Sequence, residues 1–150
     1  MSRASVAALA LLIAPVVAAQ TPAARPLTFE TRIDGIFGRR VTTTHVGLGV
    51  TRRASRSFDI QAVVGGGFTI RDETNDATAS ARADVLARFA PQPVGRNRWS
   101  AYAAGGVSAL VERHARGRAV LALLVGASWR RAFVEAGLGG GVRVGAGLRF

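Results

Sequence analysis

The chain has 150 residues, enough for one domain, and it contains no cysteine. The missing cysteine excludes a disulfide framework, a cysteine nucleophile and a thiolate metal site. Hydrophobic residues make up 49% and charged residues only 19%, which excludes a disordered chain. All 20 basic residues are arginine, and against 9 acidic residues they give a formal net charge of +11.

Residues 1–19 predict a cleaved secretory signal peptide. A short basic start is followed by an uncharged run over 4–19, broken only by Pro15, and by small residues at 17–19. A retained membrane anchor is the alternative, but Pro15 and the small-residue end favour cleavage. We expect residues 20–26 to form a short N-terminal periplasmic segment. In an exported chain, the basic charge indicates anionic lipid head groups as partners rather than nucleic acid.

Apolar and polar residues alternate with period two over most of the remaining chain, 27–150, which predicts strands. In chain order the predicted strands cover 27–34, 45–50 with a threonine-rich start, 58–70, 81–89, 99–111, 119–129, 132–138 and 142–150. The predicted connections lie at 37–40, 52–57, 71–78, 91–98, 112–118, 130–131 and 139–141. Short links between successive strands predict an antiparallel up-and-down meander.

Two segments are also compatible with helices. Residues 77–90 are rich in alanine, and residues 119–129 form a short apolar run without a clear phase. We interpret both as strands, because the charges in 82–88 fall on one face of a strand and the flanking sequence is all-β. The alternative is a mixed α+β fold.

The charged residues within the predicted strands share one phase, opposite the apolar face of their own strand. They are Glu30, Arg32, Asp34, Asp59, Arg82, Asp84, Arg88, Glu135, Arg143 and Arg149. An arginine facing lipid at the midplane would cost roughly 2–4 kcal/mol, whereas mixed charges in a lumen can pair. We therefore predict an all-β fold, an eight-stranded antiparallel transmembrane barrel over 27–150. All of these charges except Arg149 are assigned to an ion-pair network in its lumen.

Aromatic residues gather at the end of the predicted barrel that carries both termini, as expected for a rim in a membrane interface. They are Phe29, Phe58, Phe89, Trp99, Trp129, Phe133 and Phe150. Phe133 differs from the others, because it is in phase with Glu135 and is predicted to point inward.

The final ten residues, Gly-Val-Arg-Val-Gly-Ala-Gly-Leu-Arg-Phe, resemble the C-terminal signature of bacterial outer-membrane β-barrel proteins. With the segment Tyr-Ala-Ala-Gly-Gly-Val at 102–107, the chain is similar to the small porin-like barrels of the OmpA/OmpX type. The resemblance implies location in the cell outer membrane. We expect a monomer in contact with outer-membrane lipid and lipopolysaccharide. The resemblance also implies that the barrel assembly machinery reads an assembly signal formed by Val142, Val144, Ala146, Leu148 and Phe150.

The sequence departs from parts of this family. Its predicted loops are short, whereas adhesive members carry long ones, and we expect no periplasmic domain after Phe150. Some eight-stranded outer-membrane barrels are lipid-modifying enzymes such as lipid A deacylases, but His45 lies beside threonines without the His-x-Ser-Asn pattern of the deacylases. We interpret His45 as a histidine facing the lumen and His114 as a solvated loop residue.

No catalytic residue, cofactor site or metal site is predicted. Asp72, Glu73 and Asp76 are interpreted as a solvated loop rather than a calcium site. Arg113, Arg116 and Arg118 form a basic connection that is either a contact for lipopolysaccharide phosphates or a solvated hairpin tip. We expect a non-enzymatic outer-membrane barrel with a structural or surface-interaction role. The alternatives are a narrow channel for small solutes, a lipid-acting enzyme, and a soluble periplasmic barrel that binds a small apolar ligand.

Overall fold

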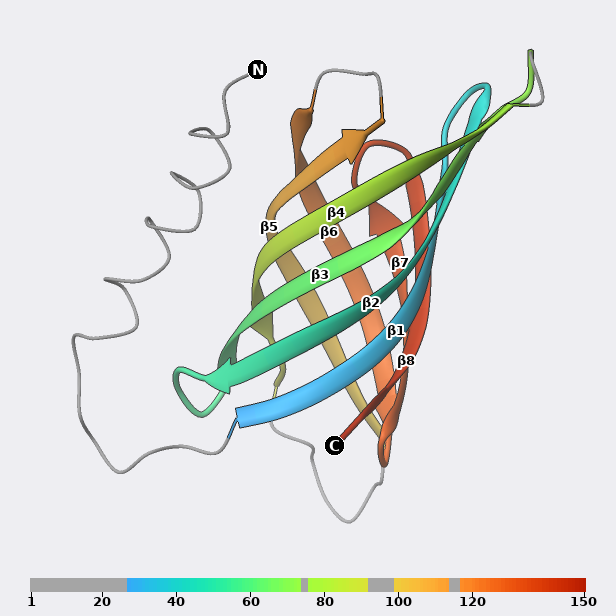
Figure 1. Ribbon diagram of the computed structural model, residues 1–150. Coiled ribbons are helices and arrows are strands. Elements are labelled where there is room, and N and C mark those ends of the chain that lie inside the picture. Colours follow the sequence, from blue (N-terminus) through green and yellow to red (C-terminus); the bar gives the residue numbers. More distant parts are fainter. Residues whose placement is uncertain (1–26, 74–75, 92–98, 114–116) are drawn as a thin grey trace.

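The computed structural model describes residues 27–73, 76–91, 99–113 and 117–150. These residues form a closed barrel in which eight antiparallel strands follow one another in chain order (Figure 1). The strands are β1 (Leu27–Phe37), β2 (Val41–Arg53), β3 (Phe58–Arg71), β4 (Asp76–Phe89), β5 (Trp99–Glu112), β6 (Arg118–Trp129), β7 (Ala132–Leu138) and β8 (Val142–Arg149). The all-β, eight-stranded fold class is confirmed, while the expected signal peptide and segment 20–26 lie outside the described residues.

The barrel is closed by pairing between its first and last strands. Glu30 of β1 lies opposite Arg149 of β8, and the register continues to Phe37 opposite Val142. At the very end of the chain, the Phe150 amide donates to the Phe29 carbonyl at 2.8 Å. Every strand therefore has two neighbours, and no sheet edge is left open.

The two alanine-rich or apolar segments of uncertain type are strands β4 and β6. β4 begins at Asp76, so the connection predicted over 71–78 is shorter than expected, and Ile70 pairs with Ala77. Pairing with β3 and β5 satisfies the backbone of β4 along its length, which overrides the helix propensity of its alanines. No helix with the length and apolar character needed to cross a membrane occurs in the described residues.

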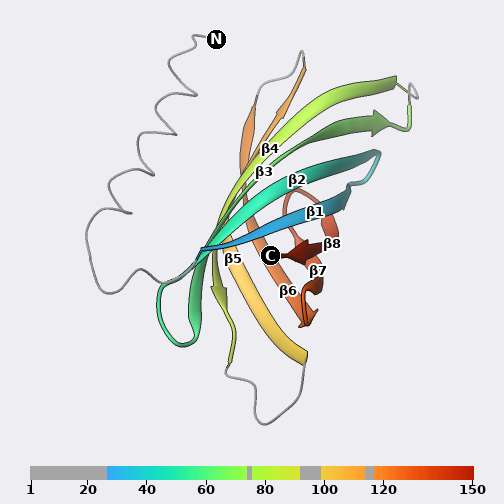
Figure 2. The same cartoon turned by 60° about the horizontal axis from the view of Figure 1, so that its bottom comes forward.

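The two ends of the barrel differ. We call the end that carries Leu27 and Phe150 the terminal end, and the opposite one the far end (Figures 1 and 2). The β3–β4 hairpin projects beyond its neighbours at the far end (Figure 1). β7 and β8 are the shortest strands, with 7 and 8 residues. Gly140 lies in the connection between them with φ 80°, a left-handed conformation that glycine adopts without strain.

Side chains alternate between an apolar outer surface and a filled interior. Val46, Leu48, Val64, Leu121 and Leu123 are all more than 60% exposed on the outside. Inside, a cluster of Leu86, Ala104, Ala122 and Leu124 lines the β4–β6 wall. Much of the remaining interior holds charged groups from β1, β3, β4, β7 and β8, so the lumen has an apolar side and an ionic side.

Candidate functional site: the charged lumen

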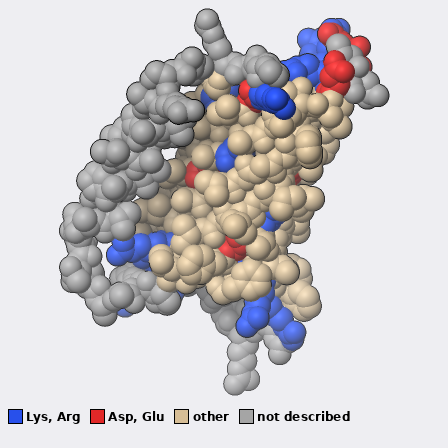
Figure 3. Space-filling view, in the orientation of Figure 1, with Lys and Arg blue, Asp and Glu red and all other residues tan. Residues whose placement is uncertain are grey.

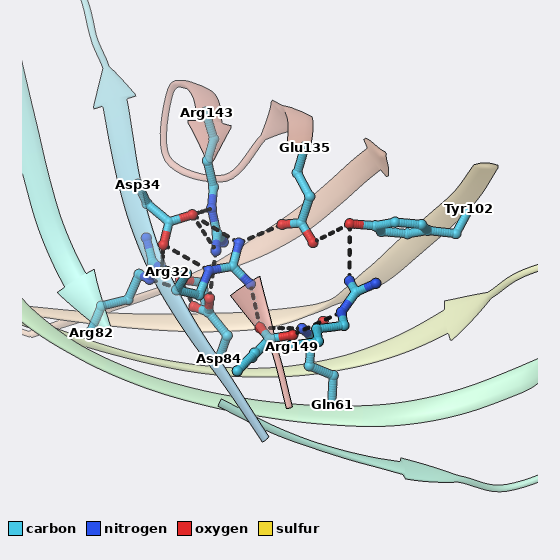
Figure 4. Close-up of polar contacts among 11 residues, drawn as sticks. Arg32, Asp34, Gln61, Arg82, Asp84, Tyr102, Glu135, Arg143 and Arg149 are labelled. Carbon is cyan, nitrogen blue, oxygen red and sulfur yellow. Dashed lines mark hydrogen bonds and ion pairs between the residues drawn. The ribbon is translucent and has the colours of Figure 1, made fainter. Parts of the chain in front are cut away.

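Asp34 of β1 lies at the centre of the ionic side of the lumen (Figure 4). Its side chain is 1% exposed and accepts hydrogen bonds from Arg32 Nε and Nη2, both at 2.9 Å. Arg82 Nη2 of β4 donates to it at 2.6 Å, and Arg143 Nη2 of β8 lies 3.3 Å away. Three guanidinium groups from three strands thus share one carboxylate.

Arg32 extends this centre toward the terminal end. Its Nη1 donates to Glu30 Oε1 at 3.1 Å, and its Nη2 also donates to Glu135 of β7. Gln61 Nε2 of β3 donates to the same Glu30 oxygen at 2.6 Å. Arg32 is therefore fixed by carboxylates on two strands, and its planar group is held in one orientation.

A second carboxylate, Asp84, binds the other side of the arginine cluster. Arg143 Nη2 donates to Asp84 Oδ2 at 2.8 Å, and Ser108 of β5 donates to Oδ1 at 2.6 Å. Arg82 Nε lies 3.2 Å from the same carboxylate. Asp34 and Asp84 together hold Arg82 and Arg143 between them.

Aromatic rings and arginines fill the terminal end of the lumen. The Tyr102 hydroxyl donates to Glu135 Oε1 at 2.9 Å and accepts from Arg149 Nη2 at 3.3 Å. The Arg149 guanidinium also lies 4.3 Å from the centroid of the Phe133 ring. Gly126 makes this packing possible, because a Cβ there would lie 2.5 Å from Tyr102 Cζ.

The luminal charges balance. Five arginines face five carboxylates, and every pair is at or near the interior. The arginines are Arg32, Arg82, Arg88, Arg143 and Arg149, and the carboxylates are Glu30, Asp34, Asp59, Asp84 and Glu135. Each of these charges has an opposite partner, which buried charges require, whereas Arg82, Arg88 and Arg143 each keep at least one guanidinium N–H without a hydrogen-bond partner in the described residues. The arrangement forms a neutral, interlocked plug across the barrel.

A histidine and hydroxyl layer lies on the wall of β2, β3 and β4. His45 is fully buried, and its Nε2 is 3.0 Å from Ser80 Oγ, while the hydroxyls of Thr43 and Thr69 are 3.0 Å apart. Within the described residues His45 Nδ1 has no hydrogen-bond partner. The Ser80–His45 pair thus lacks the carboxylate that would orient the ring in a hydrolytic triad, and it lies inside the barrel rather than on its outer surface.

A cavity of about 250 Å³ opens above this layer at the far end. Its walls include Arg39, Arg71, Glu112 and Arg118, and Thr43 contributes to its lining. Arg71 Nη2 donates to Glu112 Oε2 at 2.5 Å across it. The cavity is a shallow polar vestibule on the plug. No cluster of three or more metal-ligating side chains occurs in the part of the chain that the structure describes.

The structure places all nine residues assigned to the luminal network inside the barrel. Asp59 and Arg88 form their own pair at 2.7 Å near the terminal end, and the other seven are connected through Arg32 and Asp34. Phe133 is 2% exposed and points inward, as predicted. Tyr102, Gln61 and Ser108 join the network without having been assigned to it. Tyr102 lies in a strand whose phase the sequence left uncertain, because no charge marks one of its faces.

The remaining candidate residues lie at the two rims. Val142, Val144 and Leu148 of the expected assembly signal point outward, Ala146 is half-buried, and the Phe150 side chain is 63% exposed. Among the basic loop residues, the Arg113 amide donates to the Ala79 carbonyl at 2.9 Å, and Arg118 opens β6 with an exposed side chain. Arg116 and His114 lie outside the described residues.

The fold has a solved counterpart. The crystal structure of the outer membrane protein OprG from Pseudomonas aeruginosa superposes with a TM-score of 0.56 over 84% of this chain and 96% of that one. The two sequences are 10% identical, so the likeness concerns the fold. No protein-family model and no curated protein sequence matches the chain. The barrel architecture is thus similar to that of this outer-membrane protein, and what fills the lumen follows from this chain's own residues.

Proposed function

We propose that the protein is a non-catalytic barrel of the outer membrane with a structural or surface-interaction role. The observation that carries this proposal is the inverted pattern of its side chains, with large apolar groups outside and paired charges inside. Continuous exposed apolar surface of this extent needs lipid or a partner to cover it. A closed barrel is one of two architectures that satisfy every backbone hydrogen bond in lipid.

The aromatic residues mark one membrane interface. Six of them point outward at the terminal end: Phe29, Phe58, Phe89, Trp99, Trp129 and Phe150. Such a band is typical of a membrane interface. We place the terminal end in the periplasm and the far end at the cell surface, so that the chain enters and leaves from the side on which it is assembled.

The neutral plug supports a barrel that does not conduct. Arg32, Arg82 and Arg143 are each at most 3% exposed and cross the lumen between strands. Passage of a solute would require several of these pairs to break together. The vestibule at the far end is the observation that favours the second candidate, a narrow channel, because its arginines could collect small anions.

Conductance and location test this proposal together. The purified protein should show accelerated migration on a gel when unheated, and the cellular protein should fractionate with the outer membrane. In planar bilayers we expect no current steps. Reproducible steps would support the channel instead, and recovery of the folded protein in the soluble periplasmic fraction would refute the membrane barrel. A changed lipid A mass on overexpression would indicate a lipid-acting enzyme.

We further propose that the basic connection at the far end contacts phosphates of lipopolysaccharide. Arg113 and Arg118 flank the β5–β6 connection, and an arginine pairs with phosphate through two parallel hydrogen bonds. Replacing both by glutamine should weaken binding of the detergent-solubilised barrel to lipopolysaccharide. The matched control replaces two arginines of the β1–β2 connection at the same end, Arg39 and Arg40, and should bind as the parent does. Equal binding by the first variant would leave the connection as a solvated hairpin.

A further inference from the structure

The charge outside the lumen is distributed unequally between the two ends. All nine acidic residues of the chain are described: five lie in the plug, and the other four, Asp72, Glu73, Asp76 and Glu112, lie at the far end. There they accompany arginines, and Arg40 pairs with Glu73. Figure 3 shows acidic and basic side chains together over the β3–β4 tip and basic side chains gathered at the lower, terminal end.

Four exposed arginines form what we call the basic rim of the terminal end. Arg53 and Arg56 come from the β2–β3 connection, and Arg130 and Arg131 form the β6–β7 connection. Among the described residues, Arg53 is the one rim arginine in an ion pair: its Nε lies 3.6 Å from Asp59, whose main partner is Arg88 at 2.7 Å. The basic rim is therefore a strongly cationic surface with almost no internal compensation.

The basic rim lies directly beside the aromatic band. Trp129 precedes Arg130, whose guanidinium carbon is 5.2 Å from the Trp129 ring centroid. Trp129 stacks on Trp99 with centroids 5.9 Å apart, and Phe58 packs against Phe89 at 5.1 Å near the other connection. Tryptophan rings settle at the level of the head groups, and a long arginine beside them reaches the phosphates.

The turn that holds Arg130 adds an independent observation. Arg130 and Arg131 make a two-residue hairpin connection, and Arg130 has φ 53°. Such turns favour glycine or asparagine, because a side chain with a Cβ is strained in the left-handed region. The turn itself would form more easily with glycine or asparagine. An arginine at this position therefore indicates that its charge serves a function.

From these observations we infer that the basic rim is a binding surface for anionic phospholipid head groups. The occupant is a phosphodiester lipid with net negative charge, of the phosphatidylglycerol class, in the leaflet that faces the terminal end. The arginines pair with its phosphates while its acyl chains lie against Trp99, Trp129 and the outer surface below them. This inference rests on the proposed membrane location and adds a lipid preference at one end.

The chain supplies its own probe for this preference. Its two tryptophans, Trp99 and Trp129, both lie at the terminal end and stack on each other. Lipids brominated on their acyl chains quench tryptophan fluorescence only when they lie next to it. Titrating bromo-phosphatidylglycerol against bromo-phosphatidylcholine in vesicles containing the full barrel therefore measures the relative binding constant beside Arg130 and Arg131, the part of the basic rim next to the tryptophans.

We expect the parent protein to prefer the anionic lipid about fivefold, the factor that one arginine near an anionic surface supplies. The double variant Arg130→Asn with Arg131→Gln removes both charges, and asparagine keeps the left-handed turn accessible. Its preference should fall toward one. The matched control, Arg39→Gln with Arg40→Gln, removes the same charge from the far end and should keep the parent's preference.

Equal quenching by the two lipids in the parent, or an unchanged preference in the terminal-end variant, would overturn the inference. Loss of preference in the far-end control would overturn it as well, because net charge alone would then explain the selectivity. Heat-modifiable migration is measured on the same vesicles. A barrel that inserts without lipid preference contradicts only the basic rim, whereas a chain that fails to insert contradicts the proposed function.

Discussion

Replacing Asp34 by asparagine should destabilise the barrel strongly, because it removes the carboxylate on which three arginines converge. The substitution preserves shape and leaves Arg32, Arg82 and Arg143 around a neutral amide, whose nitrogen can only donate. Five luminal arginines would then face four carboxylates in a region where Asp34 is 1% exposed. Removing one partner of a buried ion pair costs about 3–5 kcal/mol, and we expect the free energy of unfolding to fall by that amount.

Urea unfolding of the barrel in lipid vesicles, followed by tryptophan fluorescence, measures this loss. Asp59→Asn is the matched control, since the same chemical change is made at the terminal end, where Arg88 is its main partner at 2.7 Å. The control should lose only about 1–2 kcal/mol. Restoring neutrality in Asp34→Asn with Arg143→Gln should return about 1–3 kcal/mol relative to the sum of the single changes.

A loss of about 1 kcal/mol or less for Asp34→Asn, no larger than that of Asp59→Asn, would refute the reasoning, because exposed and hydrated ion pairs contribute no more than this. The lumen would then be filled by water that screens its charges. The argument for a non-conducting plug would fail with it, and the current steps expected of a narrow channel should appear in planar bilayers.

Three further predictions concern packing, assembly and register. Gly67→Ala should destabilise the barrel by about 1–3 kcal/mol, because the added Cβ would lie 1.8 Å from the main-chain oxygen of Thr44 in β2. A Cβ added at Gly66 has no atom within 4 Å, so Gly66→Ala should be neutral in the same unfolding assay. Phe150→Ala should lower the amount of protein in the outer membrane. Stability of the folded barrel should change little, because the Phe150 side chain is 63% exposed and its backbone still pairs with β1. Normal amounts of the variant in the outer membrane would refute the assembly role. A cysteine at Ala83 should react with a lipid-soluble maleimide and one at Asp84 should not, and the reverse result would mean that β4 has the wrong register.

Alternation made the fold and the inward set of charges predictable. A charge on one face of a strand fixes the phase of the whole strand, since the side-chain period is two. Arg82 and Asp84 thus identified the inner face of β4 even though its alanines favour a helix. The same logic placed Phe133 inside through its phase with Glu135.

Where no charge marked the phase of a strand, the sequence did not show which of its faces points into the lumen. β5 and β6 are apolar or small on both faces through most of their length, so Tyr102 and Ser108 could not be assigned to the lumen. Nor could individual ion pairs be predicted. Arg82 reaches Asp34 across 48 residues of sequence, and this contact depends on the tilt and stagger of strands that do not pair directly.

The net charge of the chain is distributed unequally between the two ends of the barrel, so its total value hides where the charge lies. In the sequence, the connections 52–57, 91–98 and 130–131 contain seven arginines and no acid. The alternate connections, at 37–40, 71–78, 112–118 and 139–141, contain six arginines and four acids. Because an up-and-down meander sends alternate links to opposite ends, the amino-acid sequence alone already separates the two rims by charge. Most of the +11 charge of the chain therefore belongs to one rim, set apart from a neutral lumen, and a partner for it should be sought at that rim.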